Sequence, residues 1–151
     1  MAIANTALTS GSDATNQTSK VTASVSPAGN ELIEVAFEVS FVSSQATIPD
    51  PTVTGNGITY TQVAKRAHWA DGANFWSGIY LYRGMAASPS AGGITIDFGA
   101  VTMDTIAWSV SSKSGVDTGG TNGSAAVVQA VTNHADAASS LPVTLAAFGS
   151  A

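Results

Sequence analysis

L-I-E-V-A-F-E-V-S-F, residues Leu32–Phe41, is the stretch of this sequence that decides its fold. From Glu34 onward the residues alternate strictly between one apolar set and one more polar set. The apolar set is Val35, Phe37, Val39 and Phe41, and the other set is Glu34, Ala36, Glu38 and Ser40. Because successive side chains of a strand point to opposite faces, this alternation predicts a β-strand with one buried and one wetter face.

Similar short stretches recur along the chain, and clusters of Gly, Pro, Asn, Asp and Ser separate them. The further predicted strands are Lys20–Val25, Thr52–Thr54, Ile58–Ala64, Trp76–Arg83, Gly93–Phe98, Thr105–Ser112, Ala125–Thr132 and Pro142–Phe148. Helical spacing is scarce, which argues against a parallel βαβ fold. Eight or nine short strands with frequent turn signals predict an all-β fold, a single antiparallel β-sandwich or jelly-roll domain.

The composition limits the partners of the chain. Its 151 residues suit one domain, and charged residues make up only 10% of them, against about 25% in ordinary globular proteins. We therefore expect neighbouring subunits to cover much of the surface, or the surface to act as an adhesive polar face. A net charge of −5 with five Lys plus Arg argues against nucleic acid as a partner. No apolar run approaches the roughly 18 residues of a membrane span, so no membrane association is expected.

The two ends of the chain carry separate predictions. Residues 1–18 are polar and nearly uncharged, and are predicted to form an N-terminal arm ahead of a β-sandwich domain at residues 19–151. The arm is either a frayed tail or an extended segment that becomes ordered on a neighbour. Leu141–Phe148 carries no charged side chain. We expect it to be an edge strand covered by another copy or by a neighbour's arm, the alternative being central pairing within its own sandwich.

The motifs that carry chemistry are weak, and no enzymatic activity and no cofactor are predicted. His68 and His134 are far apart and neither has nearby ligands, whereas a zinc site needs three or four. There is no G-x-S-x-G elbow. Glu34 and Glu38 are predicted to lie on the outer face of their strand rather than across a glycosidase cleft. The loop Gly115–Gly123 has a single carboxylate and no following Lys, and it is interpreted as a connection.

Aromatic residues give the one candidate binding site. His68, Trp69, Phe75 and Trp76 lie in or beside a predicted loop at Lys65–Phe75. Exposed Trp can stack on sugars or anchor a protein interface. The alternative is that Trp76, together with Tyr80 and Tyr82, caps the core of the sandwich. Trp69 lies in a polar loop and is the better candidate for an exposed contact.

The order of several motifs resembles a known family. V-T-A-S-V-S-P-A-G-N-E-L-I-E-V is followed by P-T-V-T-G-N-G-I-T-Y-T-Q-V-A, I-Y-L-Y-R-G-M-A-A-S-P-S-A-G-G-I-T-I-D-F-G and I-A-W-S-V-S-S-K-S-G-V-D-T-G-G-T-N-G. Together they resemble β-sandwich modules of tailed-phage virion proteins and of prophage-like bacterial open reading frames. The resemblance covers about Val21 to Phe148. It implies a role in capsid decoration (cement) or in a tail appendage.

This resemblance sets the expected function. We expect a non-enzymatic virion protein that binds the phage major capsid protein and reinforces the outer capsid surface. It is expected to form a homo-oligomer, with a trimer favoured, and to assemble in the bacterial host cytoplasm. The alternative is a carbohydrate- or receptor-binding module of a tail fibre or spike, which would use Trp69 and its aromatic neighbours.

Overall fold

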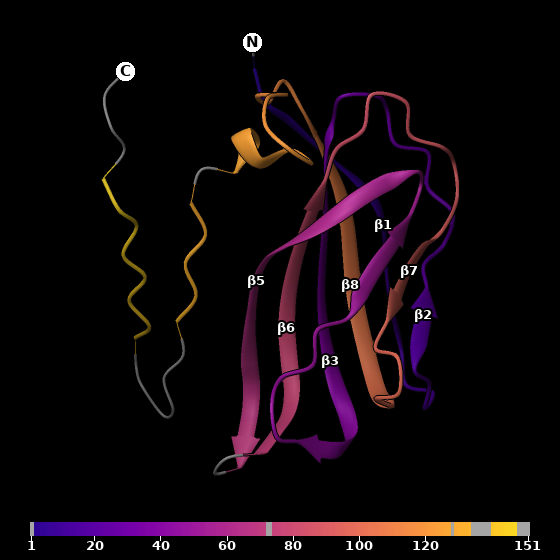
Figure 1. The fold of residues 1–151 in the computed structure, drawn as a ribbon, viewed down its shortest axis with the longest axis vertical. Helices are drawn as coiled ribbons and strands as arrows, with labels where there is room; N and C mark the ends of the chain where they lie inside the picture. Colours follow the sequence, from indigo (N-terminus) through magenta and orange to yellow (C-terminus); the bar gives the residue numbers. More distant parts are fainter. Residues whose placement is uncertain (1, 72–73, 128, 134–139, 148–151) are drawn as a thin grey trace.

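The alternating stretch forms β3 (Leu32–Gln45) in a computed structural model, which describes residues 2–71, 74–127, 129–133 and 140–147. The other strands are β1 (Ala4–Asp13), β2 (Ser19–Val21), β4 (Thr52–Gly55), β5 (Ile58–Asp71), β6 (Asn74–Gly84), β7 (Ile94–Asp97) and β8 (Met103–Ser114). A 3₁₀ turn, η1 (Ser124–Ala126), follows β8. Figure 1 shows the strands and the segment beyond η1.

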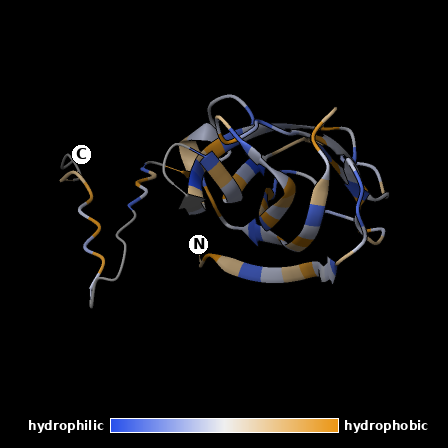
Figure 2. Ribbon diagram, turned by 90° about the horizontal axis from the view of Figure 1, so that it is seen from below, coloured by the Kyte–Doolittle hydropathy of each residue, from blue (hydrophilic) through white to orange (hydrophobic). Residues whose placement is uncertain are grey.

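All strand pairs are antiparallel, and the strands form one sheet in the order β1-β8-β3-β6-β5-β4-β7-β2. The long strand β5 joins the two parts of this sheet, because its body pairs with β6 while its start pairs with β4. The sheet curls on itself, as the view in Figure 2 shows. The prediction of a single all-β antiparallel domain is confirmed, and its strands form one curled sheet.

The core lies inside the curl. The apolar set of β3 is buried as predicted, and Glu34 and Glu38 lie on the wetter face. Phe37 stacks on Tyr80 of β6 with ring centroids 4.9 Å apart. Phe98, which follows β7, meets Phe37 and Tyr80 edge-on at 6.3 and 5.7 Å. These ring contacts pack the β7 part of the sheet against the inner face of β3 and β6.

Further contacts connect the region of β1 and β8 with β2, although β1 and β2 stand at opposite ends of the strand order. Lys20 of β2 forms an ion pair with Asp13 of β1 and lies 5.2 Å from the centre of the Trp108 ring on β8. Gln17, between β1 and β2, exchanges two main-chain hydrogen bonds with Met103 of β8. The connection from β1 to β2 therefore spans the open side of the curl.

Most of the N-terminal segment that was expected to be a polar arm belongs to the sheet. Residues 4–13 of the expected arm form β1, which pairs with β8 along its whole length. Two apolar contacts accompany this ladder, since Leu8 packs against the core and the Trp108 ring lies against Gly11. The expectation that this segment needs a neighbour to become ordered is wrong for residues 4–13, because β8 satisfies its main chain and Leu8 adds apolar burial.

The last two predicted strands are absent from the described residues. Where Ala125–Thr132 was expected, residues 125–126 belong to η1, Val127 is extended, and residues 129–132 form no strand, while Val128 lies outside the described residues. Residues 142–147 of the expected strand Pro142–Phe148 also form no strand, and Phe148 lies outside the described residues. In the part of these stretches that the structure describes, the alternating apolar residues meet no partner strand, so their pattern alone does not produce a sheet.

The expected position of Trp108 also requires a correction. We expected Phe37, Val39, Trp108 and Val110 to be buried on facing sheets. Phe37, Val39 and Val110 are buried, but β3 and β8 are hydrogen-bonded neighbours. Trp108 is only partly buried, because it lies under β1 near the edge of the sheet.

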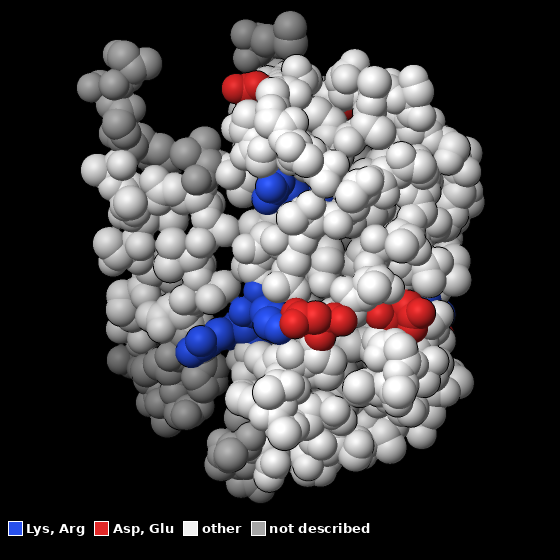
Figure 3. All heavy atoms as spheres, in the orientation of Figure 1, with Lys and Arg blue, Asp and Glu red and all other residues white. Residues whose placement is uncertain are grey.

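The surface is poor in charge, as the composition indicated. Figure 3 shows one face on which Lys, Arg, Asp and Glu atoms gather mainly in a band across the middle, with a few more above it and uncharged atoms over most of the remaining surface. Among the described residues, no helix has the length and apolar character that crossing a membrane requires.

Candidate functional site

The candidate site is the tip of the hairpin formed by β5 and β6. The strands pair as far as Ala70 with Phe75 and Asp71 with Asn74, so the region predicted as a loop is largely strand. The register shifts on both sides of Trp69, between Ala67 and Trp69 and between Trp69 and Ala70. Bulges of this kind bend a strand and redirect its side chains. They explain why the periodicity of the sequence did not predict the full length of β5.

Trp69 and Trp76 come together at this tip. Their rings stack with centroids 5.5 Å apart and an interplanar angle of 28°. Trp69 is 58% exposed, whereas Trp76 and Phe75 are half-buried. The two Trp side chains therefore form a shared aromatic surface, of which Trp69 is the accessible part. We call this pair the aromatic tip.

The remaining two predicted site residues contribute differently. Phe75 belongs to β6 and pairs with Ala70 across the hairpin. His68 belongs to β5, but its side chain lies outside the described part of the structure. The structure thus joins Trp69 and Trp76 in one surface, with Phe75 beside Trp76 in the chain.

The base of the hairpin is rigidly packed. Tyr80 and Tyr82 of β6 are buried, and their hydroxyl groups donate to the carbonyl oxygens of Pro49 and Pro51 at 2.9 and 2.7 Å. Burial, with a smaller effect from the negative charge of Asp50, raises the pKa of Tyr82 to about 12. These tyrosines therefore belong to the core, as the alternative interpretation of them held, while Trp69 does not.

Charges near the aromatic tip are few. Lys65 of β5 forms an ion pair with Asp50 and donates to the Ile48 carbonyl, so its ammonium group is held by the β3–β4 connection. Arg66 is exposed on the same strand. The tip accordingly offers an aromatic face with a cationic residue further down the hairpin.

The other sequence candidates do not form a reactive site. No group of three or more metal-ligating side chains occurs among the described residues, and His134 lies outside them. In the loop Gly115–Gly123, Asp117 accepts a hydrogen bond from the Gly119 N–H at 2.8 Å, which is a turn rather than a cation site. Glu34 forms an ion pair with Lys113 on the neighbouring strand. That pairing gives Glu34 a structural role.

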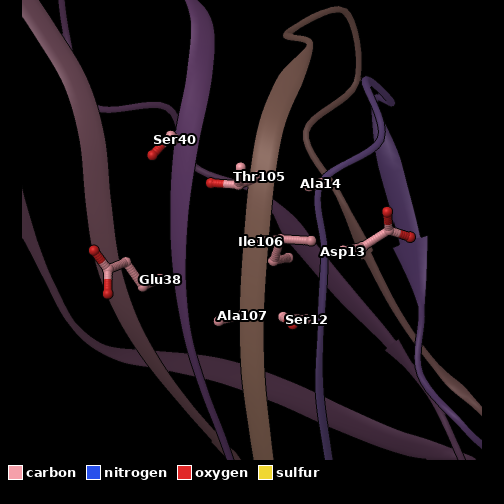
Figure 4. A pocket seen from close by; sticks show the side chains of 8 residues that line it. All are labelled: Ser12, Asp13, Ala14, Glu38, Ser40, Thr105, Ile106 and Ala107. Carbon is pink, nitrogen blue, oxygen red and sulfur yellow. The ribbon is translucent and has the colours of Figure 1, made fainter.

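An open groove of about 430 Å³ was not predicted from the sequence. It is lined by Ser12, Asp13, Ala14, Glu38, Ser40, Thr105, Ile106 and Ala107, from the β1, β3 and β8 region (Figure 4). The carboxylates of Asp13 and Glu38 lie on opposite sides of β8 and do not converge. Asp13 is bound to Lys20, which holds the pKa of this carboxyl well below its usual range. The groove therefore lacks the paired carboxylates of a glycosidase.

Comparison with known proteins adds no relative to this description. No protein-family model, no curated protein and no solved structure matches the chain.

Proposed function

We propose that this chain is a non-enzymatic structural protein that binds a larger assembly through its aromatic tip, and that this assembly is the outer capsid surface of a tailed phage. The observation that carries the binding role is the stacked Trp69–Trp76 pair at the end of a strand hairpin, with Trp69 58% exposed. The choice of a phage capsid rests on the resemblance of the sequence motifs to virion modules.

The physical argument for binding concerns desolvation. Large exposed aromatic side chains are the residues that most often dominate protein interfaces, because they bury much apolar area and have few rotatable bonds. The stacking on Trp76 restricts Trp69 further, which lowers the entropy lost on binding. A chain with 10% charged residues also brings few charges that an interface must desolvate.

A second candidate function is carbohydrate binding, as in a tail fibre or spike. It is favoured by the same exposed indole face, because the C–H groups of a sugar ring can lie against a flat aromatic surface. The two candidates differ in the partner and use the same residue.

The test measures both partners with the same variants. Capsids assembled from the major capsid protein of the same genome are sedimented with the wild-type chain, with Trp69→Ala and with Ile79→Ala, and the same proteins are applied to a glycan array. Ile79 is an exposed apolar residue of β6 outside the tip, so Ile79→Ala is the matched control. The proposal expects co-sedimentation that Trp69→Ala abolishes, that Ile79→Ala retains and that soluble sugars do not inhibit.

Other results assign the function differently. Array binding that Trp69→Ala abolishes, without capsid binding, would establish the carbohydrate role instead. Capsid binding that is equal for all three proteins would remove the aromatic tip from the interface.

A further inference from the structure

Two Asn-Gly pairs, Asn56–Gly57 and Asn122–Gly123, give this chain two sites for the same spontaneous reaction. The glycine nitrogen attacks Cγ of the asparagine side chain and forms a new N–C bond, while the Cγ–NH₂ bond breaks and ammonia leaves with the proton of the glycine N–H. Water then opens the resulting succinimide to aspartate or isoaspartate. Glycine favours the attack because it has no Cβ that hinders the approach. Each event replaces an uncharged amide by a carboxylate.

The two pairs have similar φ angles. These angles are 56° and 65° for Asn56 and Gly57, and 51° and 77° for Asn122 and Gly123. Neither glycine N–H donates a hydrogen bond to another described residue. Both nucleophiles are therefore equally available. The difference between the two sites lies in what surrounds each asparagine side chain.

Asn56 is protected by the fold. It is 5% exposed, and its Nδ2 donates to the carbonyl oxygens of Ser90 and Gly92 at 2.9 and 3.0 Å. Cγ can approach the Gly57 nitrogen only if the side chain rotates and breaks both hydrogen bonds. Burial also keeps out the water that the later hydrolysis requires. The reaction at Asn56 therefore needs a local opening of the β4–β5 turn, which makes it slow in the folded chain.

Asn122 is held far less firmly. It is half-buried and lies in the connection between β8 and η1. Within the described structure one hydrogen bond restrains its side chain, from Nδ2 to the Thr61 hydroxyl oxygen at 3.2 Å, which is at the long end of the usual range. Rotation of the side chain toward the Gly123 nitrogen breaks this bond alone and leaves the core intact. The partial exposure also admits water to the succinimide.

The surroundings of Asn122 also favour a charged product. Thr61, to which Asn122 is bound, lies directly opposite Arg83 in the β5–β6 register. Side chains that are opposed in this way have Cβ atoms about 5 Å apart. Arg83 Nε is buried and has no hydrogen-bond partner in the described structure. Because a nearby cation favours the ionised form of a carboxyl group, a carboxylate at position 122 meets a favourable charge.

We propose that Asn122 is a modification site that deamidates spontaneously in the folded chain, whereas the fold preserves Asn56. The aspartate product adds one negative charge to the β8–η1 connection. The isoaspartate product also routes the main chain through Cβ, which lengthens it by one carbon just before Gly123. Gly123 has little room for such a change, because a Cβ at this glycine would lie 2.7 Å from Leu32 Cδ1. Isoaspartate at position 122 should therefore loosen the contact of this connection with Leu32.

The experiment follows both sites in the same molecule. The purified full chain is incubated at mildly alkaline pH, because deprotonation of the glycine N–H speeds the attack, and is then digested with trypsin. Cleavage after Lys and Arg places Asn56 in peptide 21–65 and Asn122 in peptide 114–151. Mass spectrometry measures the conversion of amide to acid in each peptide. Asn122 should convert at least about tenfold faster than Asn56, which corresponds to about 1.4 kcal/mol in activation free energy.

The same incubation in guanidinium chloride is the matched control, because unfolding removes the contacts of both side chains. There the two peptides should convert at similar rates. Asn122→Gln retains an amide but would have to close a larger ring, so peptide 114–151 of this variant should stay unmodified. Equal or slower conversion of peptide 114–151 in the folded chain overturns the inference, and so does a preference that persists after unfolding. Conversion that Asn122→Gln leaves unchanged places the reaction at another residue, such as Asn133, and overturns it as well.

Discussion

Phe37 connects the two parts of the curled sheet through its ring. It is 3% exposed, stacks on Tyr80 and Tyr82, and meets Phe98 edge-on. Removing the ring from such a site loses its apolar burial and leaves a cavity that the neighbours fill only in part. Phe37→Ala should lower the free energy of unfolding by about 3–5 kcal/mol.

Urea titration measures this loss, with Val42→Ala as the control on the same strand. Val42 is 47% exposed, so its truncation removes fewer contacts. Equal urea midpoints for the two variants would contradict the assigned core.

Asp13 shows how one charge contributes to closing the curl. Its hydrogen bond with Lys20, followed by bonds from Thr15, holds the pKa of the carboxyl well below its usual range in the folded chain. A carboxyl whose folded pKa is lowered stabilises the fold above its unfolded pKa of about 3.9, and this contribution is lost as the pH falls further.

Asp13→Asn should therefore lower the melting temperature at pH 7, and the difference from the wild type should shrink as the pH falls below about 4. Thermal melts from pH 7 to pH 2 check this, with Asp104→Asn as a control for removing an exposed carboxylate. A difference that stays constant to pH 2 would rule out the ion pair as its cause.

At the scale of elements, the turn between β4 and β5 holds distant loops together. Asn56 has a positive φ of 56° and is buried. The side-chain NH₂ group of Asn56 donates to the carbonyl oxygens of Ser90 and Gly92 at 2.9 and 3.0 Å. The main-chain carbonyl of Asn56 accepts a hydrogen bond from the Ser90 N–H. One residue thus shapes the hairpin turn and fastens the β6–β7 connection to it.

Asn56→Ala should cost about 1–3 kcal/mol more than Asn30→Ala, because it removes two partly buried hydrogen bonds, leaving the Ser90 carbonyl without this donor while the Gly92 carbonyl keeps the Val25 N–H. Asn30 also has a positive φ, 59°, but is exposed, so its substitution reports the backbone strain alone. Chemical denaturation of both variants measures the difference, and equal losses would show that the side-chain bonds of Asn56 contribute nothing.

At the scale of the whole molecule, the tyrosines make stability depend on alkaline pH. Burial raises the pKa of Tyr60, Tyr80 and Tyr82, for Tyr82 to about 12. A phenol with a raised folded pKa stabilises the fold fully below its unfolded pKa of about 10, and this contribution is lost as the pH rises toward the folded value. The chain should unfold between about pH 10 and pH 12, with tyrosinate absorbance appearing together with the loss of the circular dichroism signal.

Tyr60→Phe isolates this effect, because the buried Tyr60 hydroxyl has no hydrogen-bond partner in the described structure. The variant should be at least as stable as the wild type at pH 7, and its alkaline unfolding should move to higher pH. Unfolding at an unchanged pH would show that Tyr60 takes no part in the transition.

The alternation of β3 was sufficient to predict a strand, its buried face and its wetter face, because side-chain direction in a strand depends only on local geometry. The aromatic residues of the tip were singled out from their type and their polar surroundings, and their role as a binding site stays a prediction. The stacking of Trp69 on Trp76 was not predicted from the sequence, because it depends on bulges that shift the register of β5 against β6. A bulge changes which residues face each other without changing the composition of either strand.

The sequence by itself determined the all-β class, the positions of most strands and the poverty of surface charge, since these follow from local periodicity and from composition. Only the tertiary structure decided that the polar N-terminal residues form β1, because the main chain of β8 offers a ladder that no local pattern reports. It likewise decided that the apolar residues 141–147 stay outside the sheet. A strand is stable only where a partner satisfies its peptide groups, and the identity of that partner is a property of the folded molecule.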